Sequence, residues 1–270
     1  MGFCYNGSMA ELLSSLSNPL IKQARSLRQK KARSETGLFL VEGIHHVGEV
    51  AEAGWDIQSV LYSPDLLTSD FAHGLINSLE KRYIRTQPVS ASVMDTLTEK
   101  DNPTGILALV SQRKKGLADF MTTEVSSALA LVSPQDPGNV GSILRTMDAV
   151  GLDVLFLLDG GVDVYHPSVV RASMGTIFWK PIIHATFIDF IAWAHHAGLQ
   201  LVGSSAHATT DYREARVSRP WVLVLGSEQK GLSTSQLSAC DLTVSLPMCG
   251  RASSLNLSVA AGILLYEWIR

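Results

Sequence analysis

The sequence predicts an α/β fold in two parts: a small α/β domain over residues 10–115 and a larger domain with a parallel sheet over residues 125–270. Short aliphatic runs alternate with helical patterns along the chain, as in α/β proteins. In the second part these runs are unbroken, which is typical of parallel strands covered by helices on both faces. The chain has 270 residues and is 46% hydrophobic. That is enough apolar surface for a large core, and it excludes intrinsic disorder.

Composition also excludes several classes of protein. The longest apolar stretches reach about five residues, whereas a membrane-spanning helix needs roughly twenty. The net charge of −3 excludes a polycation. The cysteines are three and widely spaced, so they form neither a disulfide framework nor a zinc set, and a reduced, cytoplasmic protein is expected. They are Cys4, Cys240 and Cys249.

The start of the chain carries no targeting pattern. No Lys or Arg occurs before Lys22, so the basic flank of a secretory signal and the arginines of a transit peptide are missing. We interpret residues 1–8 as a disordered leader, and Met9 is an alternative start.

The elements of the first part follow in order. Asn18 and Pro19 predict a helix start, because a polar cap precedes a proline in the first turn. Apolar residues then keep helical spacing as far as Leu27. The next expected elements are a strand at 37–43, a helix at 44–53, strands at 60–62, 82–87 and 106–110, and a linker from Arg113 to about Ser127.

Within this part, residues 22–33 hold six basic side chains and no acidic one. Such a run can contact RNA phosphates, or it can be the solvated face of a helix. The six are Lys22, Arg25, Arg28, Lys30, Lys31 and Arg33.

The second part shows five aliphatic strands, at 128–132, 154–158, 201–203, 222–225 and 242–246. Open parallel sheets bind ligands beyond the carboxyl ends of their strands. We therefore expect functional residues in three loops at those ends.

In the loop after the first of these strands, a Pro/Gly turn leads into a helix for which Asn139 is the expected cap. A helix start offers free N–H groups to an anion. Arg145 lies within that helix. The alternative is an ordinary connection with a surface arginine.

The loop at 225–232 has Gly226 and Gly231 at the spacing of a phosphate-binding P-loop, but Leu232 stands where that motif needs Lys. The P-loop interpretation therefore fails. A tight turn carrying Glu228 remains, and this acid is either functional or a helix cap.

The loop at 246–258 leads into an apolar helix that we expect Ser253 or Ser254 to cap. Asn256 is then expected in the first turn, where Asn is a poor helix former, so capping does not explain it. No G-x-G-x-x-G pattern occurs. The adjacent histidine pairs at 45–46 and 195–196 lack metal-ligand spacing, so no metal site is predicted.

Together and in order, these loops resemble the three motifs of the SpoU/TrmH family of RNA ribose 2′-O-methyltransferases, in the SPOUT class. The matching segments are Asn139-Val-Gly-Ser-Ile-Leu-Arg145, Gly226-Ser-Glu228-Gln-Lys-Gly231, and Leu246-Pro-Met-Cys-Gly250 with Ser254-Leu-Asn256-Leu-Ser258. The segment 167–175 resembles the family's middle region. Upstream, Asn18-Pro19, Phe39-Leu-Val-Glu42-Gly43 and Gly105-Ile106 resemble the small RNA-binding domain, similar to a ribosomal protein, that often precedes the catalytic one.

The resemblance implies a C-terminal trefoil knot and S-adenosylmethionine as cofactor, held by Gly226, Leu246, Met248 and Leu255. It nominates Arg145 as the central catalytic residue, with Asn139, Glu228, Ser254 and Asn256 completing the site. Arginine is a poor general base, so Arg145 is either a base in an unusual setting or a clamp on the RNA phosphate.

The partners implied are RNA and a second copy of the chain. Residues 259–268 could form part of a homodimer interface or belong to the core. Predicted RNA contacts are Lys22, Arg25, Lys30, Lys31, Arg33 and Arg171. Ribosomal RNA is the expected substrate, with tRNA as a rival and a non-catalytic RNA-binding assembly protein as the alternative from another class.

Overall fold

The computed structural model describes residues 11–98, 104–121 and 125–269. The expected leader and the alternative start at Met9 lie outside this range. The chain divides into two compact units, with the boundary between Gln112 and Arg113. In the described residues, no helix is both long enough and apolar enough to cross a membrane.

The first unit is built on a four-stranded sheet in the order β1-β4-β2-β3. Its strands are β1 (Leu38–Glu42), β2 (Ile57–Tyr62), β3 (Thr86–Pro88) and β4 (Ile106–Ser111). Its helices are α1 (Pro19–Ser26), α2 (Lys30–Thr36), α3 (Ile44–Glu52), α4 (Asp70–Lys81) and α5 (Ala91–Leu97). The β4 strand runs antiparallel to both β1 and β2.

The predicted start of α1 is confirmed, since the Asn18 side chain accepts a hydrogen bond from the Leu20 N–H at 2.9 Å. Ile21, Ala24 and Leu27 are fully buried and pack with α5 against the sheet. The basic segment does not form one continuous helix, because the chain turns between α1 and α2. Helices α4 and α5 had no counterpart among the predicted elements.

The second unit holds a seven-stranded sheet in the order β7-β6-β5-β10-β8-β11-β9, and all its neighbouring strands are parallel. The strands are β5 (Ser127–Val132), β6 (Val154–Leu158), β7 (Ile182–Ala185), β8 (Gln200–Ser204), β9 (Thr210–Asp211), β10 (Trp221–Leu225) and β11 (Leu242–Ser245). The parallel α/β sheet and its five aliphatic strands are confirmed. The short edge strands β7 and β9 were missed.

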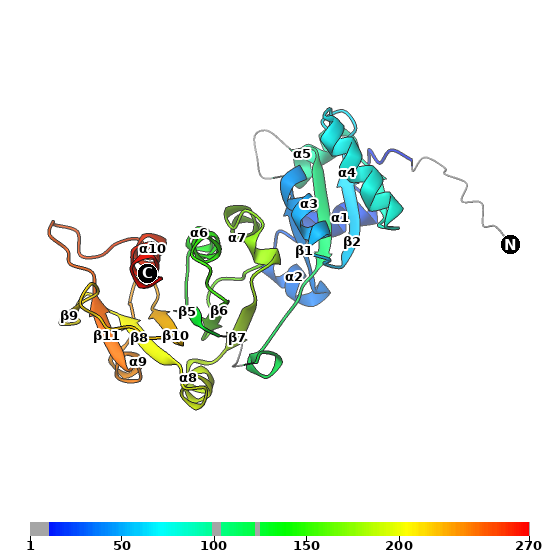
Figure 1. Ribbon diagram of the computed structural model, residues 1–270. Helices are drawn as coiled ribbons and strands as arrows, with labels where there is room; N and C mark the ends of the chain where they lie inside the picture. The colour runs from blue at the N-terminus through cyan, green and yellow to red at the C-terminus, as the bar shows by residue number, and fades with distance from the viewer. Residues whose placement is uncertain (1–10, 99–103, 122–124, 270) are drawn as a thin grey trace. The chain divides into compact units, whose positions relative to one another are not determined.

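Helices cover both faces of this sheet (Figure 1). On one face lie α6 (Pro137–Ala149), α7 (Pro167–Ala172) and α10 (Leu257–Trp268), and on the other lie α8 (Phe187–His196) and α9 (Thr234–Ser238). Every residue of β5, β6 and β10 is buried, as their unbroken aliphatic sequences require. The predicted trefoil knot concerns the threading of the chain, which strand order does not define, and it stays a prediction.

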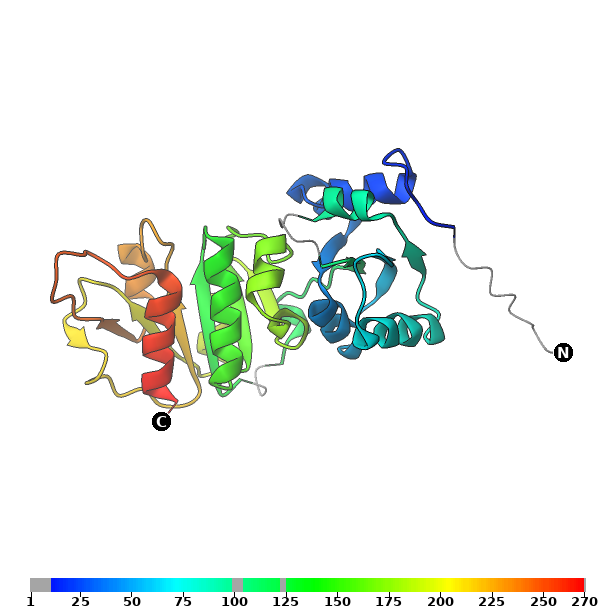
Figure 2. The same cartoon turned by 90° about the horizontal axis from the view of Figure 1, so that it is seen from above.

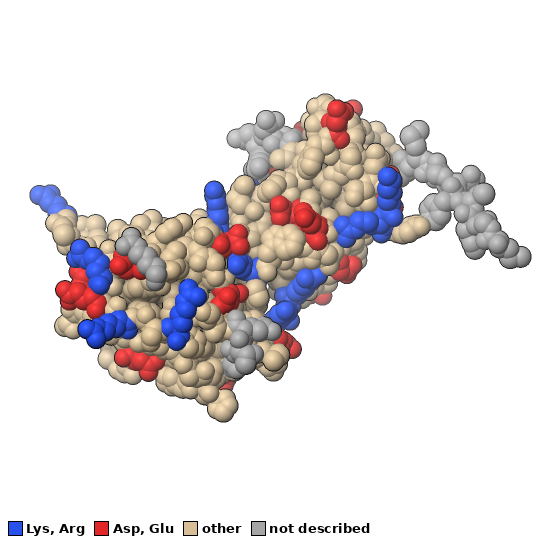
Figure 3. Space-filling model, viewed as in Figure 1, with Lys and Arg blue, Asp and Glu red and all other residues tan. Residues whose placement is uncertain are grey.

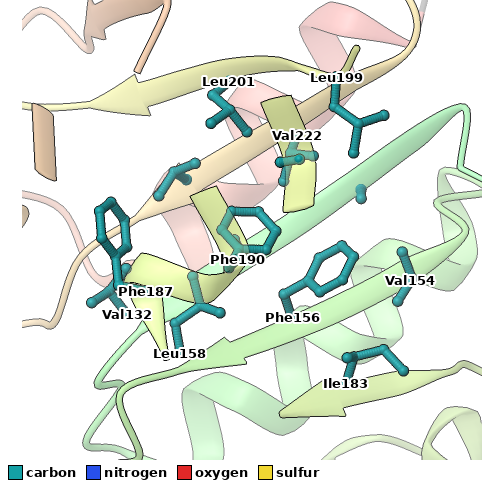
Figure 4. Close-up of a cluster of buried hydrophobic side chains, with 14 of the residues drawn as sticks. Val132, Val154, Phe156, Leu158, Ile183, Phe187, Phe190, Leu199, Leu201 and Val222 are labelled. Carbon is teal, nitrogen blue, oxygen red and sulfur yellow. The ribbon is translucent and has the colours of Figure 1, made fainter. Parts of the chain in front are cut away.

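The core between the sheet and α8 is aromatic and aliphatic (Figure 4). The ring of Phe156, from β6, lies 4.9 Å from the ring of Phe190, from α8. Val132, Leu158 and Val222 belong to the same cluster. This packing fixes the carboxyl ends of β5, β6 and β10, from which the functional loops depart.

The expected linker after Arg113 is instead packed on the second unit. Lys115 pairs with Ile183 in an isolated parallel bridge, and Phe120 joins the core cluster. The Tyr165 hydroxyl donates a hydrogen bond to the Arg113 carbonyl. Burial, assisted by the charge of Asp163, raises the pKa of Tyr165 to about 12, so this phenol stays protonated. Polar composition alone suggested a linker, but a few apolar residues bind the segment to the sheet.

Candidate active site

Three loops meet at one edge of the second unit's sheet. They follow β5, β10 and β11, whose carboxyl ends point the same way because the strands are parallel. β10 lies beside β5, and β8 lies between β10 and β11. The loops are far apart in sequence but neighbours in space.

Side-chain hydrogen bonds join all three loops. Asn256 Nδ2 donates to Asn139 Oδ1 at 2.8 Å, across 117 residues of sequence. Asn139 Nδ2 donates in turn to Glu228 Oε1 at 3.0 Å, across 89 residues. Asn139 is only 8% exposed, whereas Glu228 is half-buried and Asn256 is exposed, so only the middle of this hydrogen-bonded chain is shielded from water. Three of the five predicted catalytic residues are thus in direct contact.

Glu228 also binds the backbone that leads into α6. Its two carboxylate oxygens accept hydrogen bonds from the N–H groups of Gln135, at 3.0 Å, and Asp136, at 3.1 Å. Burial alone would raise the pKa of Glu228, but these bonds and the one from Asn139 outweigh it, and the pKa lies below the usual value. The side chain is therefore ionised at neutral pH and its oxygens are already engaged. Glu228 is not the cap of a described helix, since it binds N–H groups just before α6, whose cap is Asp136.

The two predicted helix caps at this site are wrong. The cap of α6 is Asp136, whose side chain accepts from the Asn139 N–H at 2.7 Å, and Asn139 lies within the first turn. The cap of α10 is Asn256 itself, which accepts from the Ser258 N–H at 2.9 Å. In both cases an Asp or Asn competes with nearby polar residues for the cap, and sequence alone did not decide between them. Asn256 serves twice, since its oxygen caps the helix while its nitrogen binds Asn139.

Two glycines permit close backbone approaches at the site. A Cβ on Gly226 would lie 2.0 Å from the carbonyl carbon of Gly231, so only glycine allows the loop after β10 to fold back on itself. A Cβ on Gly141 would lie 2.6 Å from the Ala172 Cβ, where α6 packs on α7. Both glycines belong to the motifs singled out above.

The loops after β10 and β11 line a cavity of about 350 Å³. All four residues predicted to hold a cofactor line it, namely Gly226, Leu246, Met248 and Leu255. Glu228 and Ser254 line it as well, whereas Asn139, Asn256 and Arg145 do not. The walls also include buried leucines at 225, 232 and 257.

One part of the wall was missed by sequence reasoning. Ser205, Ala206 and His207 line the cavity from the loop after β8. A usable signal was present, because β8 was predicted and its carboxyl end had to lie at the same edge of the sheet as the other loops.

Arg145 lies on the exposed side of α6, and its side chain has no hydrogen bond or ion pair to any described residue. Its neighbour Thr146 faces Gly262 of α10, with the Thr146 Cγ2 4.0 Å from the position of a Cβ on Gly262. Helices α6 and α10 lie side by side (Figure 2). The guanidinium is therefore available to a ligand outside this chain's own contacts.

The predicted RNA contacts fall into three groups. Lys22, Arg25, Lys30 and Lys31 are exposed in the first unit. Arg171 is half-buried in α7. For Arg33 the prediction is wrong, because its side chain is 1% exposed and its Nη1 donates to two backbone carbonyls.

No group of three or more His, Cys, Asp or Glu side chains that could hold a metal ion occurs within the described ranges.

Comparison with known proteins agrees with this geometry. The model of the SpoU rRNA Methylase family matches residues 126–266, which include all three loops and the cavity. The chain belongs to the SpoU rRNA methylase family. A second model, the MRM3-like substrate binding domain, matches residues 18–108 of this SpoU protein, which lie in its first unit.

Individual relatives cover nearly the whole chain. A 23S rRNA (uridine(2479)-2′-O)-methyltransferase of Streptomyces viridochromogenes is 32% identical over 90% of this chain and 86% of its own. A 23S rRNA (guanosine(2553)-2′-O)-methyltransferase, RlmP, of Bacillus subtilis is 29% identical over 94% of this chain and 98% of its own. The crystal structure of an AdoMet-bound rRNA methyltransferase from Sinorhizobium meliloti superimposes with a TM-score of 0.86, at 36% identity over 96% of this chain and 97% of its own.

Proposed function

We propose that this chain transfers a methyl group from S-adenosylmethionine to a ribose 2′-hydroxyl of ribosomal RNA. The observation that carries the proposal is the cavity at the carboxyl edge of the sheet, lined by the loops after β8, β10 and β11, in a member of the SpoU family. The named relatives methylate 23S rRNA on ribose, which favours ribosomal RNA over tRNA.

The cavity suits this cofactor in size and in chemistry. Its volume of about 350 Å³ falls in the range of small-molecule sites. Leu225, Leu246 and Leu257 offer an apolar wall, and the glycine turn at 226–231 exposes backbone groups to a ligand. Bound there, S-adenosylmethionine supplies a methyl group already activated by a sulfonium. Alignment of the ribose hydroxyl then accounts for much of the rate, because the donor needs no further activation.

Three of the residues predicted to be catalytic are better described as positioning residues. Asn139, Glu228 and Asn256 direct their polar groups at one another and at backbone N–H groups. Their role in the proposal is to hold the three loops in the shape that forms the cavity. Glu228 and Ser254 both line the cavity, and Ser254, whose side chain is exposed, can contact a ligand there.

Arg145 is proposed as a clamp on the RNA phosphate next to the target ribose. A guanidinium stays protonated in proteins, so it does not act as a base, but its planar fork matches a phosphate. Its exposure and lack of a partner within the described chain fit this role. The hydroxyl proton then leaves to the phosphate or to water.

A homodimer is the proposed assembly. Helix α10 is apolar around its circumference, with Ala261, Leu264 and Leu265 buried against the core. Its outer side carries Val259, Ile263 and Tyr266, which are 49%, 37% and 54% exposed. An apolar stripe of this kind beside α6 suits an isologous contact with a second copy. A cytoplasmic location likewise stays a prediction.

The test combines cofactor binding with methyl transfer. Calorimetry should show binding of S-adenosylmethionine, and labelled methyl groups should be incorporated into unmodified ribosomal RNA. Mapping of ribose methylation in cells with and without the protein then identifies the nucleotide. Incorporation into tRNA alone would correct the substrate, and RNA binding without cofactor binding or incorporation would replace the enzyme with an assembly protein.

A further inference from the structure

The six basic residues between positions 22 and 33 are not equivalent in the structure. Arg33 is buried, and Arg28 Nη2 donates to the Thr98 carbonyl at 2.6 Å. Lys31 has an acidic neighbour on its own helix, with its Nζ 3.9 Å from a Glu35 oxygen. Lys22, Arg25 and Lys30 are exposed, and their side chains make no hydrogen bond or ion pair with other described residues.

Part of this segment forms a hollow. A concavity of about 340 Å³ lies at the end of α1, and we name it the basic cup. It is lined by Lys22, Arg25, Ser26, Arg28 and Gln29. None of its lining residues is acidic, and three are positively charged.

The carboxyl end of a helix normally repels anions, because its last carbonyls are unpaired and carry partial negative charge. Here every carbonyl from position 23 to position 28 accepts a hydrogen bond. The last two are neutralised by Arg33, whose Nη1 lies 2.8 Å from the Leu27 oxygen and 2.7 Å from the Arg28 oxygen. Arg33 therefore contributes as a positioning residue that both fixes the turn and removes the repulsion.

We infer that the basic cup binds the phosphodiester backbone of the substrate RNA, a step that rests on the proposed function. Lys22 and Arg25 are one turn apart on α1 and supply the mobile charges, while Arg28 is held in place through Thr98. On the face shown in Figure 3, basic and acidic side chains are interspersed. Attraction for RNA in the first unit then comes from this local cluster, since the whole chain carries a net charge of −3.

The test removes the two mobile charges with the double variant Lys22→Ala/Arg25→Ala. The probe is an unmodified 23S rRNA transcript, and binding is measured by filter retention from about 50 to 300 mM KCl. The expected result is an affinity about tenfold or more lower, with the slope of log K against log [KCl] smaller by about 1 to 2. Both side chains are exposed, so the melting temperature should stay unchanged.

A matched control loses the same number of charges elsewhere. The double variant Arg213→Ala/Arg216→Ala removes two exposed cations of the second unit, where Arg213 Nη2 lies 2.6 Å from an Asp211 oxygen. Its RNA affinity and salt slope should stay close to those of the parent. Equal losses in the two double variants, or unchanged binding in Lys22→Ala/Arg25→Ala, would overturn the inference. So would tighter binding of polyglutamate than of RNA, which would indicate an acidic protein partner.

Failure of the cup and failure of the proposed function give different results. If the cup is correct, the variant binds S-adenosylmethionine like the parent and recovers methyl transfer at saturating RNA. A parent chain that binds RNA through the cup but neither binds the cofactor nor transfers a methyl group refutes the methyltransferase and leaves the cup standing.

The role of Arg33 has its own measurement. Arg33→Lys keeps the charge but cannot bond two carbonyls with the same planar fork. We expect it to weaken RNA binding without reducing the salt slope, because Arg33 contacts carbonyls and not phosphate. A reduced slope in this variant would place Arg33 among the phosphate contacts instead.

Discussion

Glu228 directs its whole carboxylate at the surrounding chain. Three donors reach its two oxygens, from Asn139 and from the backbone of Gln135 and Asp136. A charged acceptor in several hydrogen bonds is strongly held in one orientation. At the scale of single residues, the site is therefore organised by a carboxylate for which we propose a positioning role.

The pH dependence of stability tests this assignment. The folded pKa of Glu228 lies below its usual 4.5, so its contribution is complete above that value and is lost as pH falls through the folded pKa. The melting temperature of Glu228→Gln should lie below that of the parent at pH 7, and the gap should close in acid. Calorimetric scans between about pH 7 and 3 measure this. A gap that is constant over that range would show that the charge does not matter.

Arg145 is the complementary case, a charged side chain with no partner inside the described chain. If its planar fork holds the RNA phosphate, Arg145→Lys should lower the rate of methyl transfer by about 100-fold and leave cofactor affinity unchanged. Arg216→Lys, at an exposed arginine before β10, is the control and should be neutral. Nearly full activity in Arg145→Lys would refute the need for a guanidinium.

At the scale of elements, α10 is joined to the rest of the site through its first residue. Asn256 caps the helix with its oxygen and reaches Asn139 with its nitrogen. Helix α10 also packs against α6, so the two helix starts and the β10 loop form one hydrogen-bonded group. A substitution at Asn256 should therefore change the stability of α10 through the capping bond and the shape of the cavity through the bond to Asn139.

Two substitutions at position 256 separate them. Asn256→Ala loses both functions and should cost about 1 kcal/mol of stability as well as most of the activity. Asn256→Asp keeps a capping oxygen but loses the donor to Asn139, so it should retain most of the stability and still lose activity. Ser69→Ala, which removes the cap of α4 in the first unit, is the control that loses stability alone. Full activity in Asn256→Asp would exclude the link between the loops as a requirement.

At the scale of the whole molecule, the exposed stripe on α10 is where the proposed homodimer can be tested. Ile263→Glu places a charge in the stripe and should convert the dimer to monomers in sedimentation experiments, because burying an unpaired carboxylate is costly. Ile188→Glu is the matched control, since Ile188 on α8 is 80% exposed and lies on the opposite face of the sheet. A parent that is monomeric, or an equal effect of both substitutions, would contradict the dimer.

Much of the architecture could be predicted from sequence because it rests on local patterns. Unbroken aliphatic runs mark β5, β6 and β10, and the Asn18 cap marks α1. Strands β7 and β9 were not predicted because they are short edge strands with polar residues. The packing of the segment after Arg113 was not predicted because its contacts with Tyr165 and Ile183 are tertiary.

The sequence predicted which loops form the candidate site, but not what each polar side chain in them does. Motif order brought the right loops together, and the residues nominated for the cofactor do share a cavity. Which polar side chain caps a helix depends on the path of the backbone, so the caps at Asn139 and Ser253 or Ser254 were wrong. The burial of Arg33 was equally invisible, since its partners are backbone carbonyls that any sequence would supply.

The bond between Asn139 and Asn256 has a consequence for the chain during translation. Asn139 and Glu228 leave the ribosome well before Asn256, and the loop at 246–256 supplies part of the cavity wall. The cavity is therefore incomplete until residues 246–260 have been synthesised and have left the exit tunnel. A growing chain that has not reached this point lacks part of the cavity wall and the hydrogen bond from Asn256 that links the loops.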